Sequence, residues 1–333
     1  MQPENQAVQL RFLACLVLSA VIFATDCNRA QPFAEPSFTL KAVGRNAWAA
    51  IENRRAKAPS GANAGFVIGE DSVAVIDTFA SREAARQLLA EVRTLTKLPV
   101  RFVINTHHHY DHVAGNGIFV EAGALVLGQR HVRDWIHAET LRGMAIAAAA
   151  GNDITPEERA VVKAFVPPAV VYDDAVDLYL GSREIQVRRS PGHTGGDSVV
   201  FVPDAKLAFA GDLFWRNTVP NTTDASTKPW IETLSALARD RAGFTFVPGH
   251  GDVGNAQDVA VFRDYLATLR TLVAEAQTQG RPDSGAVVET VTTPLKARYG
   301  QWDFFTYNAR PNILDMDAEL RGTKRIPTPQ RPE

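Results

Sequence analysis

The chain has 333 residues, of which 45% are hydrophobic and 22% charged, so it is long enough for one large globular domain or two small ones. With a formal net charge of -2 and a sequence pI of about 6.5, the chain lacks the excess of positive charge that is typical of nucleic-acid-binding proteins. The sequence also has no acidic tail of the kind that forms a disordered interaction arm. We therefore expect a globular protein that does not bind a nucleic acid.

The N-terminal segment, residues 1–30, differs from the rest of the chain. Residues 12–24 form an unbroken apolar and small-residue run that follows Arg11 and precedes a polar stretch. A helix of this length rises only about 20 Å, less than the ~30 Å hydrocarbon layer of a bilayer. We interpret the segment as a signal peptide and expect a periplasmic or secreted protein with no stable membrane insertion after its removal. An uncleaved anchor or a buried helix is the alternative.

Both cysteines, Cys15 and Cys27, lie in or beside this segment. A mature domain that begins near residue 31 therefore contains no cysteine, which excludes a disulfide framework and a thiolate metal site. Lipidation of Cys27 is the lesser interpretation, because Asp26 stands where such a site needs a small residue.

Short strands and helices alternate through the next part of the chain. A Gly-Glu-Asp-Ser turn at residues 69–72 lies between two β-rich runs and predicts a hairpin. Ser81 is the expected N-cap of a helix, and Pro99 ends that segment before a strand over 101–105. Further strands are expected at 124–127, 176–180, 185–189, 198–202, 206–209 and 245–247, with a long helix at 256–279. This order favours an α/β (α+β) class with sheets covered by helices.

Two segments depart from this alternation. Residues 138–166 combine an alanine-rich run with a capped helix start, and we interpret them as a helical insertion. Residues 276–333 mix proline, aromatic and charged residues, and we treat them as a C-terminal extension of a domain spanning 35–275. Either segment is a candidate for a pocket wall or for outer packing.

The segment that carries chemistry is THHHYDHVAGN, residues 106–116, directly after the strand at 101–105. Its candidate metal ligands are His107, His109, Asp111 and His112. At the end of a buried strand the chain turns into a loop, so neighbouring side chains can converge on a small volume. Imidazole and carboxylate groups are ligands that zinc accepts. Four ligands exceed what one tetrahedral ion with an open position needs, so we expect two ions and further ligands.

Three more candidates follow predicted strands in glycine-flanked turns. They are His193 in PGHTGGDS, Asp212 in AGDLFW and His250 in VPGHG. Glycine lets the backbone approach a metal closely. Each residue alone could be an ordinary turn residue, but together with the first loop they indicate a metal site.

With these residues the chain resembles the metallo-β-lactamase superfamily, whose HxHxDH, His, Asp, His pattern is filled at every position across roughly residues 38–275. The resemblance implies a metallo-β-lactamase fold, a four-layer αββα sandwich with the site at one edge. It also implies how the ligands divide between two metals: His107, His109 and His193 on one, Asp111, His112 and His250 on the other, and Asp212 bridging.

The same resemblance implies a hydrolase that acts on a small-molecule substrate and holds two Zn²⁺ ions, iron or manganese being the alternatives. Together with the predicted signal peptide, this indicates an exported hydrolase. A hydroxide bridging the ions would attack an ester, lactone, thioester or amide, with Asp111 as the catalytic residue that orients it or relays its proton. We expect Asp77 to support the ligand loop through hydrogen bonds or to cap a turn, and His108 to bind no metal. His131 and His137 are expected to be surface or packed residues.

Residues near the ligands restrict the range of candidate substrates. The best-known antibiotic-hydrolysing members carry Cys or Ser at the position of Asp212, and several carry Lys where this chain has Trp215. These differences argue against a dedicated antibiotic-hydrolysing enzyme and leave at most a weak β-lactamase activity. Asp197 stands where glyoxalase-type thioesterases commonly have another His. The alternative function is an iron-dependent oxidoreductase of the same fold, similar to persulfide dioxygenases. Substrate and oligomeric state stay open.

Overall fold

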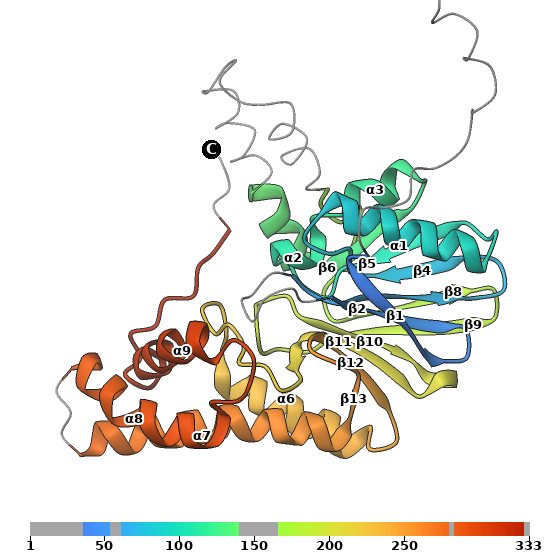
Figure 1. Cartoon of the computed structure of the whole chain (residues 1–333). Coiled ribbons are helices and arrows are strands. Elements are labelled where there is room, and N and C mark those ends of the chain that lie inside the picture. The colour runs from blue at the N-terminus through green and yellow to red at the C-terminus, as the bar shows by residue number, and fades with distance from the viewer. Residues whose placement is uncertain (1–35, 54–60, 140–165, 280–282, 330–333) are drawn as a thin grey trace, which may run out of the picture. The chain divides into compact units, whose positions relative to one another are not determined.

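The structure of the protein is a computed structural model that describes residues 36–53, 61–139, 166–279 and 283–329. The predicted signal peptide and nearly all of the predicted insertion at 138–166 lie outside the described residues. Two β-sheets form the centre of the described part, with helices on the outer face of each sheet (Figure 1).

The first sheet contains seven strands in chain order. They are β1 (Phe38–Gly44), β2 (Ala47–Glu52), β3 (Ala64–Ile68), β4 (Val73–Ile76), β5 (Val100–Ile104), β6 (Leu125–Gln129) and β7 (Val170–Tyr172). β1 to β4 pair antiparallel, whereas β4 to β7 pair parallel. The turn at 69–72 joins β3 to β4, so the predicted hairpin is confirmed.

The second sheet has six strands in the order β13-β12-β11-β10-β9-β8. Their bounds are β8 (Ala175–Leu180), β9 (Arg183–Arg189), β10 (Ser198–Val202), β11 (Leu207–Trp215), β12 (Thr245–His250) and β13 (Gly254–Asn255). Among the described strands of this sheet, β11 and β12 pair in parallel and the other neighbours pair antiparallel. A short 3₁₀ helix, η1 (Pro203–Ala205), precedes β11.

The prediction for the ends of β11 and β12 was wrong in one respect. Asp212 lies inside β11 and His250 is the last residue of β12, instead of each following its strand in a turn. The register of β11 shifts between Phe209 and Gly211, and Gly211 adopts a φ of +49°. The glycine therefore produces a local irregularity, after which the buried strand continues.

Short and long helices cover the sheets. They are α1 (Arg82–Leu95), α2 (Tyr110–Val113), α3 (Asn116–Glu121), α6 (Thr227–Asp240), α7 (Ala256–Thr278), α8 (Ser284–Tyr299) and α9 (Phe305–Leu320), and a further helix spans residues 130–139. The Ser81 hydroxyl accepts a hydrogen bond from the backbone N–H of Ala84 at 3.1 Å, which confirms the predicted N-cap. None of the described helices is long and apolar enough to span a membrane.

Three apolar clusters separate the four layers. The α1 and α3 side chains pack on the outer face of the first sheet, as Leu88 and Phe119 do. Val67 and Phe209 belong to the cluster between the two sheets. The third cluster, which includes Trp230, joins the second sheet to α6 and α7. The predicted αββα sandwich is confirmed, because each sheet buries one face on the other sheet and one on helices.

The C-terminal residues 284–320 form two helices that were not predicted. Both α8 and α9 contain a proline, Pro294 and Pro311, and proline inside a sequence weakens any helix signal. Val291 and Ile313 nevertheless belong to the same core as Trp230 of α6. Burial of these apolar faces outweighs the local cost of proline.

Candidate metal centre

The structure brings all seven predicted ligands together from both sheets. Four come from the loop after β5 and from α2. His193 lies in the loop between β9 and β10, while Asp212 and His250 lie on the parallel pair β11 and β12. Five of the seven side chains are at most 3% exposed, and the other two are His109 and Asp111.

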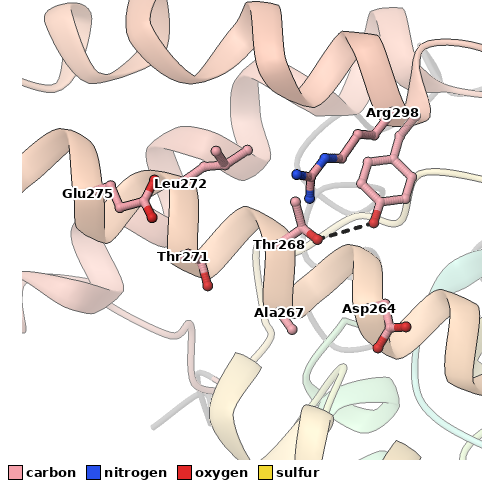
Figure 2. Close-up of a pocket in the computed structure, with 8 residues that line it drawn as sticks. Asp264, Ala267, Thr268, Thr271, Leu272, Glu275 and Arg298 are labelled. Carbon is pink, nitrogen blue, oxygen red and sulfur yellow. Dashed lines mark hydrogen bonds between the residues drawn. The ribbon is translucent and has the colours of Figure 1, made fainter.

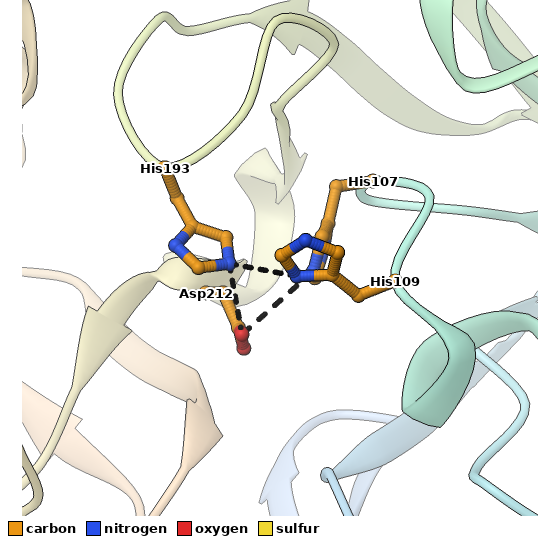
Figure 3. Close-up of side chains that lie close together, drawn as sticks. All are labelled: His107, His109, His193 and Asp212. Atoms are coloured by element: carbon orange, nitrogen blue, oxygen red, sulfur yellow. Dashed lines mark hydrogen bonds and ion pairs between the residues drawn. The ribbon is translucent and has the colours of Figure 1, made fainter. Parts of the chain in front are cut away.

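One group of potential ligand atoms joins the first loop to β11 and the β9–β10 loop. His107, His109, His193 and Asp212 place one ligand atom each within 4.8 Å of one another. Figure 3 shows the three imidazoles converging on the carboxylate. His193 Nε2 lies 3.0 Å from His109 Nδ1 and 3.3 Å from Asp212 Oδ2. This geometry fits three imidazole ligands on a single cation.

A second group lies on the other side of Asp212. Asp111, His112 and His250 also place ligand atoms within 4.8 Å of one another. His250 Nε2 lies 3.4 Å from Asp111 Oδ2, and His112 Nε2 lies 4.0 Å from the same oxygen. One carboxylate and two imidazoles suit a second divalent cation.

The two oxygens of Asp212 face different groups. Oδ1 is 3.0 Å from His112 Nε2 and 3.4 Å from His250 Nε2, whereas Oδ2 is the oxygen near His107 and His193. Asp212 Oδ1 is buried and has no hydrogen-bond partner among the described residues, and the same holds for Nε2 of His107 and of His250. Buried polar atoms without partners are costly, so these atoms fit a site that bound cations complete.

A glycine allows Asp212 to lie this close to the backbone of β12. A Cβ at Gly249 would lie 1.8 Å from Asp212 Oδ1, a distance that no real side chain tolerates. The close packing of β11 against β12 therefore requires glycine beside His250.

Asp77 supports the ligand loop, as the sequence predicted. Its Oδ1 accepts the backbone N–H of Thr106 at 2.8 Å, and its Oδ2 lies 2.8 Å from His112 Nδ1. Because the carboxylate accepts the Nδ1 proton of His112, Nε2 keeps its lone pair on the side of Asp212.

Asp224 is a functional candidate that the sequence analysis missed. Its Oδ2 lies 2.8 Å from His109 Nε2, so His109 Nδ1 is left to face His193 and the first group. Asp224 lies between β11 and α6, in a Thr-Thr-Asp-Ala-Ser run that carries no metal motif. Nothing in the local pattern distinguishes it from a turn residue.

The charges of the cluster compensate one another. Burial alone would raise the pKa of Asp212, but His250 and His112 hold it well below the ordinary value. Burial would lower the pKa of His112, yet Asp212 and Asp77 raise it well above the usual value. Burial lowers the pKa of His107. A bound cation would therefore replace a proton at this centre.

His108, which was not expected to bind a metal, packs against a neighbouring helix. It stacks on Trp135, with 4.7 Å between ring centroids and 6° between the planes, and its Nε2 lies 3.7 Å from Asp224 Oδ2.

The remaining histidines and the loop tyrosine are partly or fully exposed. His131 is half-buried beside Gly195, and His137 is exposed. Tyr110 is 47% exposed between the ligands of the loop.

Asp197 and Trp215 each support a ligand. Asp197 accepts the backbone N–H of Thr194 at 2.7 Å and so shapes the turn that carries His193. Burial raises the pKa of Asp197 to about 7. The Trp215 indole lies on His250, with 3.9 Å between ring centroids. Trp215 therefore covers the face of a ligand.

A cavity of about 520 Å³ lies elsewhere, between α7 and α8, and is drawn in Figure 2. Thr268 and Tyr299 share a hydrogen bond of 3.2 Å across it, and Arg298 is also part of its lining. None of its lining residues is a predicted ligand, so it is separate from the metal centre.

Hydrolases of named activity are among the proteins that match parts of this chain. A linear primary-alkylsulfatase of Pseudomonas sp. is 23% identical over 259 residues, which cover 67% of this chain and 48% of that protein. A hydroxyacylglutathione hydrolase of Mesorhizobium japonicum is 29% identical over 163 residues, which cover 49% of this chain and 52% of that protein. The chain spans about half the length of these two relatives.

Solved structures show the same fold. A metallo-β-lactamase from Pontibacter korlensis has a TM-score of 0.55 and 21% identity, and the match covers 69% of this chain and 99% of that one. The DIM-1 metallo-β-lactamase has a TM-score of 0.53 and 19% identity, with 70% and 98% covered. The family model of the metallo-β-lactamase superfamily matches residues 58–250, more than half of the chain. The protein therefore belongs to the metallo-β-lactamase superfamily.

Proposed function

We propose that this protein is a metal-dependent hydrolase with a dinuclear zinc centre. The observation that carries the proposal is the placement of Asp212, whose two oxygens face two separate groups of buried histidines. In this proposal His107, His109 and His193 hold one ion, and Asp111, His112 and His250 hold the other. Bound in this way, two cations supply Lewis acidity and lower the pKa of an attacking water toward neutrality.

Asp111 is the residue that we assign to the nucleophilic water. Its side chain is 29% exposed, whereas those of His112 and His250 are at most 3% exposed, so Asp111 is the member of its group most open to solvent. Burial opposes ionisation, but His112 and His250 lower the pKa of Asp111 to about 2. A carboxylate with this pKa is ionised at neutral pH, where it is a weak base, and it accepts a hydrogen bond that orients the water.

The bond that is cleaved belongs to an ester, lactone, thioester or amide in this proposal. The hydroxyacylglutathione hydrolase supports hydrolysis of an acyl compound, and the alkylsulfatase extends the candidates to alkyl sulfate esters. The alkylsulfatase match covers two thirds of this chain, which favours including that substrate in any assay. Trp215 packs on His250 and offers no cation to a β-lactam carboxylate, so we propose at most weak β-lactamase activity.

The site of action in this proposal is the periplasm or the exterior of the cell. The apolar run at 12–24 after Arg11 supports export. Mass spectrometry tests the proposed export separately. The mass of the protein isolated from a periplasmic extract is compared with the mass of the whole chain.

Elemental analysis combined with substrate assays tests the hydrolase. We expect two zinc ions per chain and turnover of at least one of a lactone, a thioester, an alkyl sulfate and a chromogenic β-lactam. Asp212→Ala should empty or weaken at least one metal position, while Asp240→Ala, at an exposed aspartate of α6 paired with Arg239, should change neither metal content nor rate. Iron without hydrolysis would move the assignment to an oxidoreductase of the same fold.

A further inference from the structure

We propose that the C-terminal segment 303–324 supports the metal centre. Within this segment, Lys324 is a positioning residue for His109, and Phe304 packs behind His250. This inference rests on the proposed function and extends the site to residues outside the family match, which ends at 250. Lys324 acts through the loop that carries Asp224.

Phe304 links the segment to the second ligand group. Its ring lies 6.0 Å from the His250 ring and 6.3 Å from the Trp215 indole, measured between centroids. Phe304 is 1% exposed and adopts a φ of +63°. This conformation is unfavourable for a residue with a Cβ, so surrounding packing must hold it.

Backbone pairing fixes the chain beside Phe304. The N–H of Val219 donates to the carbonyl of Asp303 at 2.8 Å, and the N–H of Asp303 donates to the carbonyl of Asn217 at 3.0 Å. Thr218 and Asp303 form an isolated parallel bridge. The residues that follow β11 are therefore joined to the start of α9.

Side chains of α9 hold the next part of the same connection. Asn312 Nδ2 donates to the carbonyl of Pro220 at 2.9 Å, and Asn308 Nδ2 donates to that of Val219 at 2.9 Å. The Thr222 hydroxyl lies 2.9 Å from Asn312 Oδ1. Asn312 and Thr222 are buried, so these bonds are shielded from water.

Lys324 closes the loop around Asp224. Its Nζ donates to the carbonyl of Thr222 at 2.6 Å and to that of Ala225 at 2.7 Å. These two carbonyls flank Asp224, whose Oδ2 lies 2.8 Å from His109 Nε2. Lys324 thus ties together the backbone on both sides of the carboxylate that orients a ligand.

This contact affects metal binding because His109 has two usable nitrogens. With Asp224 accepting at Nε2, the lone pair of Nδ1 faces His193, 3.0 Å away. A loop that is free to move would let the His109 ring rotate or change tautomer. Ordering of the loop before the metal arrives removes that entropy cost from binding.

A double-mutant cycle in the full chain tests this inference. Zinc affinity is measured by chelator competition for wild type, Lys324→Met, Asp224→Ala and the double variant, after removal of metal. We expect Lys324→Met to weaken one of two zinc ions roughly tenfold and Asp224→Ala to weaken it about 10- to 100-fold. The double variant should bind like Asp224→Ala alone, because Lys324 acts through Asp224.

Lys296→Met is the matched control, at an exposed lysine of α8 in the same C-terminal part, and it should leave both zinc affinities unchanged. Unchanged affinity in Lys324→Met, equal weakening in the control or multiplicative losses in the double variant overturn the inference while the proposed function stands. A wild-type chain that binds no zinc overturns both.

Discussion

The Oδ2 atom of Asp77 lies 2.8 Å from Nδ1 of His112 and also accepts the hydroxyl of Thr106 at 2.7 Å. Asp77 follows β4 with a φ of +56°, so the chain turns there and places the carboxylate beneath the ligand loop. One buried carboxylate thus determines both the position of the loop and the tautomer of a ligand.

Asp77→Asn should lower zinc affinity and kcat/KM by about 10- to 100-fold. The amide has one oxygen in place of two, and its NH₂ group would face the Nδ1 proton of His112 or the Thr106 donors. Asp71→Asn, at an exposed aspartate paired with Arg101 near the β3–β4 turn, is the control. Steady-state kinetics and metal titration give the comparison, and wild-type values for Asp77→Asn would contradict the assigned role.

Gly249→Ala should empty at least one metal position. The added methyl group would overlap Asp212 Oδ1, so either the carboxylate or β12 must move. Gly243→Ala, where a Cβ meets nothing within 4 Å, should keep full metal content. Elemental analysis gives the metal content of both variants. Two tightly bound ions in Gly249→Ala would contradict the requirement for glycine beside Asp212.

Removal of metal should lower both activity and thermal stability. Buried nitrogens such as His107 Nε2 have no hydrogen-bond partner among the described residues, so the metal-free centre retains unpaired polar atoms. Free zinc at 100 times its dissociation constant should stabilise the folded chain by about 2.7 kcal/mol per site. Calorimetry across a zinc series measures this shift, and a melting temperature independent of zinc would contradict a metal site formed only in the folded state.

Asp317 should make the C-terminal helices sensitive to acid. Burial would raise the pKa of this carboxyl, but hydrogen bonds from Ser284 at 2.5 Å and Gln277 at 2.7 Å, together with Arg321, lower it below the ordinary value. The unfolded chain therefore binds more protons as the pH falls from about 4, and the stability contributed by Asp317 is lost as the pH falls through its folded pKa.

Asp317→Asn tests this dependence. At pH 7 the substitution should cost about 1 to 3 kcal/mol, since it removes a buried hydrogen-bonded charge. The difference from wild type should shrink as the pH falls below about 4, where the wild-type carboxyl is protonated as well. Urea unfolding of metal-free protein measures it, and a constant difference across the pH range would refute the contribution of ionisation.

Much of the fold was predictable because local patterns reflect local physics. The hairpin at 69–72, the N-cap at Ser81 and the helix from Ala256 depend on residues within a few positions of one another. The extent of β11 was not predictable, because the glycine beside Asp212 suggests a turn and only the pairing with β12 shows that the strand continues. The helices around Pro294 and Pro311 likewise depend on packing rather than propensity.

The order of amino acids is sufficient for the α/β (α+β) class and for the candidate donor set, since HxHxDH and the glycine-flanked His193, Asp212 and His250 are visible along the chain. The αββα arrangement followed from the family resemblance that these residues carry. Only folding decides that Asp224 accepts from His109, and that Lys324 holds the loop around Asp224. The partners in these contacts lie about 100 residues apart or more. The physical reason is that burial of apolar faces brings together segments that are distant in the sequence. Local periodicity does not predict which polar side chains of those segments then form contacts.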